Sequence, residues 1–540
     1  MSETAPGTDL RLVPAALACW GVAGPAVGLD VVPVVVAAVV SAVAAAGCAL
    51  AAGATLRRRP QDGAAVHRAA AGPAPPTARP LRSAVVASAA LALVAAAITL
   101  ASAAAQLHER GRGPLDDLVR ERAVVEVVGT VRAEVVPLVS RWSAAAGGAD
   151  GAGGASTRHR TVLAVEQVTG RGRTGAVRAD LVVLGGAEWA AVPYGSTVAV
   201  TGRLSAAAPG QAPVGWLSAT TVVVVRAPGS MDRAVAAVRS GLLAASDGLP
   251  PDARGLVPGA AVGDTTRVPA ELVEAMRDTG LLHLTAVSGG HFAVLSLAVI
   301  GVATALRAPR ALRAALAGAA TAAFVLLVHP EPSVVRAAVM GGLSVLGMLL
   351  GRRGRAVPAL GTAVVVLLVV DPWLSRSLGF ALSVVATAAI VLVAPGWALA
   401  LGRVLPRWLA VALAVPAAAQ AACAPLIVLV DPAVPLYAVP ANLLVAPAVP
   451  PVTLLGLASA LTAGWAPGAA EALARAASWP AGWIATVARA GAELPGARLP
   501  WPGGSAGSAA LVAVTVLGVA AVRGARAASA ARARRTREPS

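Results

Sequence analysis

The chain has 540 residues, of which 57% are apolar and only 13% are charged, and its mean hydropathy is +0.73. A soluble domain is about half apolar and about a quarter charged, so this chain has too few charges to cover a globular surface. The composition excludes a soluble enzyme, a disordered chain and a disulfide scaffold, and it predicts a polytopic α-helical membrane protein.

The charge of the chain is strongly basic, with 44 basic residues against 27 acidic ones, and every basic residue is Arg. The three cysteines, Cys19, Cys48 and Cys423, all lie in apolar stretches, and no C-x-x-C metal pattern is present. No G-x-x-x-x-G-K-[ST] motif occurs either. We therefore expect no metal site, no cofactor and no ATPase activity in the chain itself.

Three apolar runs predict three membrane helices within residues 1–107, at 12–29, 31–56 and 81–107. Asp30 and Pro33 mark a turn between the first two runs, which favours a membrane hairpin over the alternative of a signal anchor. An arginine-rich linker separates the second run from the third. The positive-inside rule places this linker in the cytoplasm.

Residues 108–230 instead carry short Val-rich runs with period-two alternation, bounded by glycine-rich turns, at 124–132, 161–168, 177–184, 197–204 and 220–226. Such runs predict strands, and five of them predict a small barrel, for which an OB-like fold is the natural candidate. Three spans from a cytoplasmic N-terminus put this domain outside the cell. Trp189, Tyr194 and Trp216 could stack nucleic-acid bases on it, but they could equally belong to its core.

Residues 231–280 have the amphipathic pattern of a helix that lies on the membrane surface. Further apolar blocks fill residues 281–523, so we expect roughly eleven transmembrane helices in all. Arginine clusters recur in every second loop, at 307–313, 352–355 and 403–407, and a basic tail occupies 524–540. This alternation predicts a multi-pass protein of the cytoplasmic membrane with both termini in the cytoplasm.

One apolar block holds an unusual set of polar residues, His283, Ser288 and His291, with the pair Gly289-Gly290 between them. We expect the glycine pair to break the helix, and polar groups beside broken helices mark substrate paths in membrane proteins. The alternative is a glycine pair that packs two helices closely. A metal site would lack a third ligand in the segment, and a nucleophilic Ser288 would lack the first glycine of a G-x-S-x-G elbow.

Polar or small residues mark five later positions. Arg336 lies just inside an apolar block, where a charge faces protein or water, or else snorkels to the interface. Asp371-Pro-Trp predicts a turn with an interfacial anchor. Gly379 and Ser383 have the small-xxx-small spacing of helix packing, and Asn442 is expected to hydrogen-bond across helices.

Taken in order, these motifs resemble the signature of ComEC-type competence proteins. The shared pattern is Gly263-Asp264, Thr279-Gly-x-x-His283, Ser288-Gly-x-His291, Pro332-Ser-Val-Val-Arg336, Arg352-Arg353, Asp371-Pro, Gly379-Phe-x-Leu-Ser383 and Pro440-x-Asn442. The resemblance covers residues 255–461. It implies a translocation path at the family-motif positions Asp264, His283, Ser288, Gly289, Gly290, His291, Arg336, Asp371, Gly379, Ser383 and Asn442.

The resemblance also implies a function, which is to move single-stranded DNA inward across the cytoplasmic membrane in natural transformation. The implied partners are single-stranded DNA, membrane lipid, a membrane-anchored DNA receptor and a cytoplasmic helicase-like ATPase. Many family members end in a metallo-β-lactamase-like domain, but this sequence has no His-x-His-x-Asp-His motif. We therefore expect no nuclease activity from this chain, and either a separate nuclease supplies it or the family role is altered. The oligomeric state stays open, with a homodimer as one alternative.

Two other classes of function also stay open. A secondary transporter of a small solute with an external β-domain could use the Gly289-Gly290 region as its midplane site, and would be expected to contain internal repeats. A membrane-embedded enzyme could use His283 and His291, and would need a paired carboxylate or nucleophile at the same depth.

Overall fold

The computed structural model describes residues 10–57, 79–138, 158–285, 287–329, 332–349 and 356–535. The arginine cluster at 352–355 and most of the first arginine-rich linker lie outside these residues. The chain divides into two compact units, one made of residues 1–238 and 299–377, the other of residues 239–298 and 378–540.

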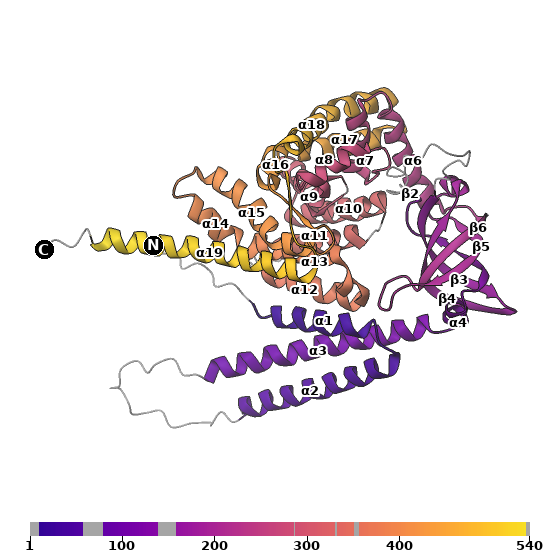
Figure 1. Cartoon of the computed structure of the whole chain (residues 1–540), viewed down its shortest axis with the longest axis horizontal. Coiled ribbons are helices and arrows are strands. Elements are labelled where there is room, and N and C mark those ends of the chain that lie inside the picture. Colours follow the sequence, from indigo (N-terminus) through magenta and orange to yellow (C-terminus); the bar gives the residue numbers. More distant parts are fainter. Residues whose placement is uncertain are drawn as a thin grey trace. The chain divides into compact units, whose positions relative to one another are not determined.

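Three apolar helices begin the first unit, as the sequence predicts: α1 (Val13–Ala26), α2 (Val31–Arg57) and α3 (Arg79–Arg110). α3 packs against both α1 and α2 (Figure 1). Much of this contact is made by alanines, among them Ala26, Ala38, Ala103 and Ala104. Small side chains let helices approach closely, which is how helices associate where lipid surrounds them.

Six strands follow in the first unit: β1 (Val124–Val131), β2 (Val136–Leu138), β3 (Arg158–Gly170), β4 (Arg173–Gly185), β5 (Thr197–Ala206) and β6 (Gly215–Arg226). The five Val-rich runs are thereby confirmed as β1, β3, β4, β5 and β6, and the short β2 is an addition. Side chains alternate between buried and exposed, as in β1, where Val125 and Val127 are buried and Val124 is exposed.

The pairing of the five long strands closes a ring. β1 pairs with β3 and β5, β3 with β4, and β5 with β6, all antiparallel, while β4 and β6 pair in parallel. The five strands thus form a small closed barrel, whose core contains Val127, Leu163, Leu181, Leu204 and Leu217, all 0% exposed. Helix α4 (Leu115–Arg120) adds Leu115 and Leu118 to the same core.

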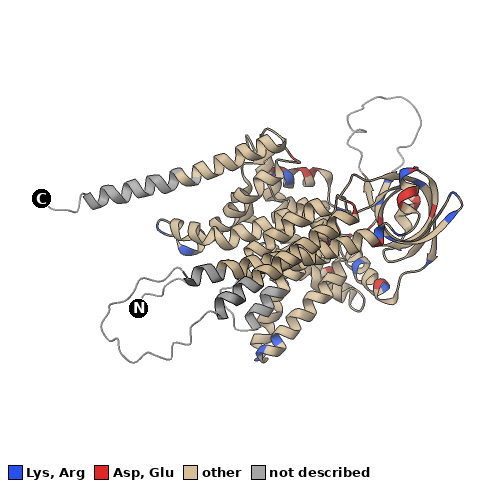
Figure 2. Cartoon of the chain, turned by 90° about the horizontal axis from the view of Figure 1, so that it is seen from below, with Lys and Arg blue, Asp and Glu red and all other residues tan. Residues whose placement is uncertain are grey.

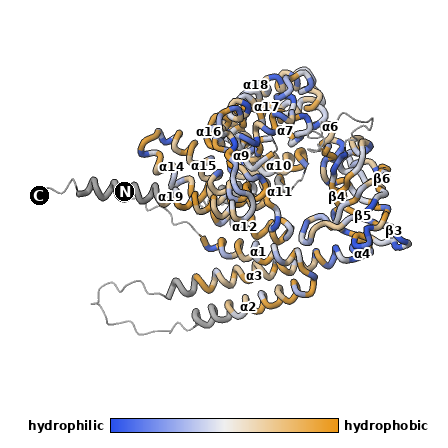
Figure 3. The backbone as a smooth tube through the Cα atoms, in the orientation of Figure 1, coloured by the Kyte–Doolittle hydropathy of each residue, from blue (hydrophilic) through white to orange (hydrophobic). Residues whose placement is uncertain are grey.

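The rest of the first unit contains α10 (Arg310–Val328), α11 (Pro332–Leu349), α12 (Ala356–Val370) and the 3-10 helix η3 (Pro372–Arg376). α10 packs on α11, α11 on α12, and α12 on both α1 and α3. Figure 3 shows that hydropathy differs within this unit. The described parts of α2 and α3 are largely hydrophobic, whereas the barrel contains both hydrophobic and hydrophilic residues. The N-terminal helices therefore share one unit with helices that follow the barrel.

The second unit is helical. Its elements are the end of α6 (Ser230–Ala245), α7 (Pro251–Val262), α8 (Ala270–Asp278), η2 (Leu282–Leu284), the start of α9 (Gly289–Ala305), α13 (Leu378–Leu392), α14 (Ala394–Leu401), α15 (Arg407–Ile427), α16 (Ala438–Val445), α17 (Val449–Thr462), α18 (Pro467–Glu493) and α19 (Gly504–Arg535). Two short strands, β7 (Ala433–Pro435) and β8 (Arg498–Pro500), pair antiparallel.

Helix α7, within residues 231–280, is covered by other helices of its unit, while the position of residues 231–280 on the membrane surface stays a prediction. Residues 255–262 are all buried, and α7 packs against α17 and α18. Gly456 of α17 permits this contact, because a Cβ there would lie 2.8 Å from the Cβ of Ala261. The apolar side chains of α7 are therefore covered by neighbouring helices of the same chain.

Four described helices, α2, α3, α10 and α15, are long and apolar enough to cross a membrane. Two bent pairs, α13 with α14 (43°) and α16 with α17 (50°), bring the number to six if each is one span. In Figure 2 most of the described helical ribbon is tan, and few positions on it have the colours of charged residues. The described chain is thus mostly helical, with four to six candidate spans and an N-terminal β-sheet domain, and the predicted count of eleven is not confirmed.

Candidate functional site

The motif segment begins where α8 ends. Gly280 has a φ of +69°, its N–H donates to the Arg277 carbonyl (3.1 Å), and the N–H of Leu281 donates to the Met276 carbonyl (2.7 Å). This pair of bonds is the Schellman arrangement, which ends a helix on a left-handed glycine. Leu281 and Met276, both 0% exposed, supply its usual apolar contact. The Thr-Gly pair of the motif is therefore a helix end.

His283 follows in η2, and its side chain is exposed. The backbone beside it rests on α7, because a Cβ at Gly259 would lie 2.7 Å from the carbonyl oxygen of Thr285. Any side chain at Gly259 would thus push on the main chain of the motif segment. The segment is supported by α7 while the imidazole of His283 stays accessible.

Helix α9 begins at Gly289, so the helix break lies before the glycine pair and not at it. The N–H of Ser288 donates to Nδ1 of His291 (2.9 Å), and Oγ of Ser288 lies 3.1 Å from the same nitrogen. A Cβ at Gly289 would meet nothing within 4 Å, and one at Gly290 only Oγ of Ser288, at 3.5 Å. Within the described residues, close helix packing therefore does not explain the glycine pair.

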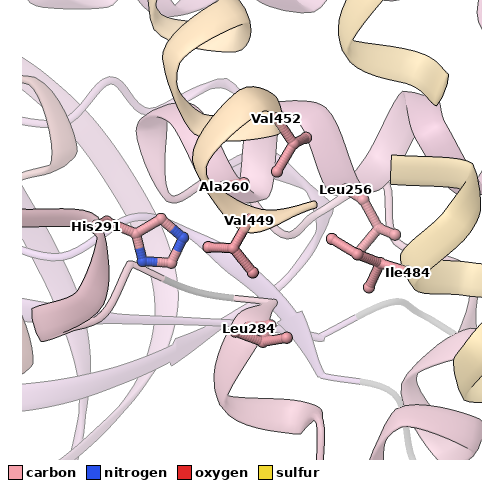
Figure 4. A pocket seen from close by; sticks show the side chains of 7 residues that line it. All are labelled: Leu256, Ala260, Leu284, His291, Val449, Val452 and Ile484. Atoms are coloured by element: carbon pink, nitrogen blue, oxygen red, sulfur yellow. The ribbon is translucent and has the colours of Figure 1, made fainter. Parts of the chain in front are cut away.

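The side chain of His291 is only 1% exposed and borders a small cavity (Figure 4). The cavity is lined by Leu256, Ala260, Leu284, His291, Val449, Val452 and Ile484. Its volume is about 10 Å³, and a water molecule needs roughly 10–15 Å³. This cavity therefore has room for about one water molecule and none for a nucleotide.

Asp264 has partners that give it a structural role. It follows Gly263, which ends α7 with a φ of +78°. Its Oδ1 accepts hydrogen bonds from the N–H (3.0 Å) and the hydroxyl (2.6 Å) of Thr266. Its Oδ2 lies 4.0 Å from Nη2 of Arg239, and both side chains are buried. Arg239 also donates to the carbonyl of Val262, so the pair joins α6 to the end of α7.

We expect Asp264→Ala to destabilise the protein by about 3 kcal/mol, because it leaves the buried Arg239 without its counter-charge. Thermal melting of the detergent-solubilised protein measures this loss. Asp247→Ala is the matched control, because it removes the exposed partner of Arg267, and should cost less than about 1 kcal/mol. Equal melting temperatures for the two variants would contradict the structural role of Asp264.

The later motif residues lie on separate elements. Oδ1 of Asp371 accepts the N–H of Trp373 (3.0 Å), which confirms the predicted turn. Trp373 itself is 4% exposed, so it packs inside the protein and is not an interfacial anchor. Gly379 and Ser383 both lie on α13. Asn442 donates to the carbonyl of Ala438 in its own helix (2.8 Å), which corrects the expectation of a bond across helices.

The three aromatic residues of the barrel domain take different positions. Trp189 is 1% exposed and belongs to the barrel core, so the expectation that it stacks on bases is corrected. Tyr194 stacks on the imidazole of His329, with ring centroids 3.8 Å apart. Trp216 is half-buried, and the guanidinium of Arg160 lies 5.9 Å from its ring centroid. Trp216 therefore remains as an aromatic surface beside a cation.

Arg336 lies near the start of α11 and is only 5% exposed. Its Nε has no hydrogen-bond partner among the described residues. The side chain is covered by protein, which argues against the alternative that it snorkels to the interface. A buried guanidinium nitrogen without an acceptor is costly, and buried charges in membrane proteins mark substrate and ion pathways.

Sequence reasoning missed the residues that join the barrel to the helices of the first unit. Arg376 donates to the carbonyls of Gly24 (2.7 Å) and Pro209 (2.9 Å), and so ties the β5–β6 loop to the end of α1. Nδ1 of His329, at the end of α10, lies 3.0 Å from a carboxylate oxygen of Glu134. These residues carry no sequence signal, because their partners are far away along the chain.

The region where the barrel meets the helices of the first unit also contains half-buried charges, those of Arg110, Asp180 and Asp371. The guanidinium of Arg110, at the end of α3, lies 3.4 Å from the ring centroid of Trp373. Burial raises the pKa of Asp371, and hydrogen bonding from Trp373 and the charge of Arg110 oppose this shift. Burial likewise raises the pKa of Asp180 on β4, opposed by Arg132 and Arg110. The charge of Arg110 thus lowers the pKa of two carboxyl groups, that of Asp180 on the barrel and that of Asp371 after α12.

We expect Arg376→Ala to speed amide exchange in residues 207–214 about tenfold or more, since it removes two charge-assisted hydrogen bonds. Hydrogen–deuterium exchange by mass spectrometry measures this effect. Arg203→Ala, an exposed arginine on β5, is the control and should leave the loop unchanged. Unchanged exchange in Arg376→Ala would show that other contacts hold the loop.

The fold and these sites define a class of protein. It is a helical membrane protein with a β-barrel domain near its N-terminus and, in its second unit, a segment that contains the motif residues His283, Ser288 and His291. A family model described as "Competence protein" matches residues 261–526. This part of the chain is a competence-family domain, and the resemblance of the chain to ComEC-type competence proteins is confirmed.

Among known proteins, ComE operon protein 3 of Bacillus subtilis (strain 168) is 33% identical to this chain over 144 residues. The aligned residues make up 27% of this chain and 19% of that protein, so the match spans about a fifth of the relative's length. No solved structure matches the chain.

Proposed function

We propose that the chain moves single-stranded DNA inward across the cytoplasmic membrane during natural transformation. The competence-family match supports DNA uptake. The observation that carries the proposal is Arg336, whose Nε has no hydrogen-bond partner among the described residues and whose side chain, 5% exposed, has to be uncovered before a strand can contact it. A phosphodiester supplies the missing acceptor, because guanidinium and phosphate match in charge and in fork geometry. DNA offers such a group at every nucleotide, as a sequence-independent path requires.

In this proposal the barrel is an OB-type domain outside the cell. Its five long strands pair in the closed order β1-β3-β4-β6-β5, with only β4 and β6 parallel. A five-stranded barrel of this kind is a recurrent oligonucleotide-binding fold. Trp216 and Arg160 offer a stacking surface with a cation beside it. We assign first contact with the strand to this pair.

The same end of several helices meets the barrel, which supports an extracytoplasmic position for it. Arg110 at the end of α3, His329 after α10 and Arg376 after α12 all take part in contacts at this end. The arginines at 307–313 lie at the opposite end of α10. By the positive-inside rule that opposite end is cytoplasmic, and the basic tail at 524–540 puts the C-terminus in the cytoplasm as well.

The proposal assigns the remaining tasks to partners. A membrane-anchored receptor delivers duplex DNA, a separate nuclease removes one strand, and a cytoplasmic helicase-like ATPase pulls the other strand inward. The sequence has no G-x-x-x-x-G-K-[ST] motif, so energy has to come from another protein. The competence-family match does not favour the alternative of a small-solute transporter.

The test is complementation in a naturally competent host that lacks its own competence channel. Fluorescent duplex DNA bound outside the cell and labelled single strands protected from added nuclease are counted separately. We expect the chain to restore protected strands without changing surface binding. A chain that inserts and accumulates normally but restores no protected strand would overturn the proposal.

A further inference from the structure

The geometry points to different roles for the residues of the motif segment. Its two ends are helix caps that position the segment. His291 is one of the capping residues and does not contact DNA. This inference deepens the proposed function and partly rests on it. It starts from the two contacts between Ser288, the residue directly before α9, and Nδ1 of His291.

The N-terminus of a helix leaves backbone N–H groups without helical partners. In a capping box, the side chain three residues into the helix accepts the N–H of the capping residue, and this side chain is ordinarily Glu or Gln. Ser288 is in the capping position and His291 is the third residue of α9. Nδ1 of His291 accepts the Ser288 N–H at 2.9 Å, as the carboxylate or amide does in an ordinary capping box.

This bond fixes the state of the imidazole. Because Nδ1 accepts a hydrogen bond from a backbone N–H, the ring proton has to reside on Nε2. Oγ of Ser288, 3.1 Å from Nδ1, then acts as a second donor to the same nitrogen. A serine that donates to an acceptor in this way also resembles a nucleophile with its base, so the capping role has to be separated from a chemical one.

The surroundings of His291 favour capping. The ring is 99% covered, and the cavity beside it is about 10 Å³ and lined otherwise by apolar side chains. A nucleotide cannot reach the ring there. The opposite end of the segment is also a cap, since Gly280 and Leu281 close the Schellman arrangement of α8. Between the two caps stands His283, whose side chain is exposed.

The experiment compares His291→Gln with His291→Ala. Glutamine retains an acceptor for the Ser288 N–H but has no imidazole, and alanine has neither. For capping we expect His291→Gln to keep DNA uptake within about threefold of the parent, and His291→Ala to lower it about tenfold or more. Equal losses in both variants would overturn the inference, because a residue that works through its imidazole tolerates neither change.

A second measurement does not depend on uptake. Hydrogen–deuterium exchange at the start of α9, in purified protein reconstituted in lipid, should be about five- to tenfold faster in His291→Ala and near the parent value in His291→Gln. Ser288→Ala keeps the backbone donor and loses the second donor to Nδ1, so its exchange should lie between that of the parent and that of His291→Ala. If uptake fails in the parent chain but this exchange pattern holds, the proposed function is wrong and the cap is right. If exchange at α9 is the same in all variants, the cap is wrong.

Discussion

Replacing Arg336 with methionine should lower DNA uptake about tenfold to a hundredfold, because it removes a charged hydrogen-bond donor to the phosphate backbone. The same change should leave the thermal stability unaltered or raise it. A buried charge without a partner costs free energy, and an apolar side chain of similar volume does not pay that cost. Arg336→Lys should retain part of the uptake, since lysine keeps the charge but loses the fork.

The opposite behaviour of uptake and stability is what separates a path residue from a structural one. Membrane abundance, melting temperature and transformation frequency have to be measured on the same preparations. Arg310→Ala is the control, because Arg310 is an exposed arginine at the far end of the neighbouring helix, and both readings should stay at the parent level. If Arg336→Met melts at a clearly lower temperature, Arg336 stabilises the fold and the path assignment fails.

His283→Ala should reduce uptake to the level of a strain without the chain, at normal protein abundance. The side chain is exposed, so its removal leaves no cavity in the core. The segment around it is held by backbone bonds at Gly280 and Leu281 and by the bond from the Ser288 N–H to His291, and the His283 side chain adds a hydrogen bond to the main chain of Gly280. A loss of uptake would therefore reflect the missing imidazole and not a collapsed loop.

His283→Gln should fail as well, which distinguishes this histidine from His291. Leu282→Ala is the matched control, since Leu282 is 36% exposed in the same 3-10 turn, and it should transform like the parent. Normal transformation by His283→Ala at normal abundance would remove His283 from the path and leave the motif with a purely structural role.

The barrel and the N-terminal helices could be predicted because their signals are local. Strands of a barrel have one face inside and one outside, so period-two alternation marks them wherever the chain runs. The burial of α7 could not be predicted in this way. An apolar residue has the same sequence signal whether lipid or another helix covers it, and the partners of α7, α17 and α18, lie about 200 residues further on.

In the candidate site, too, the sequence predicts what depends on neighbouring residues and does not predict contacts between distant ones. The motif residues were located, but their roles depend on contacts. His291 replaces the usual Glu or Gln of a capping box, so the familiar pattern does not match it. Arg376 makes its bonds to carbonyls of Gly24 and Pro209, and a carbonyl is present in every residue. No side-chain pattern could therefore have predicted these contacts between the barrel domain and the helices of the first unit.

The joint at Arg376 and His329 also determines the order of biogenesis. Ribosomes synthesise the chain from its N-terminus, so β6 is complete about 150 residues before Arg376 is made. At roughly 5–20 residues per second, the barrel is complete about 8–30 s before its last anchoring contact forms. Until His329 is made, its own core and its contact with α3 hold it. A closed barrel with a packed core can stay folded during this interval. It exposes few unpaired strand edges to chaperones, proteases or other nascent chains.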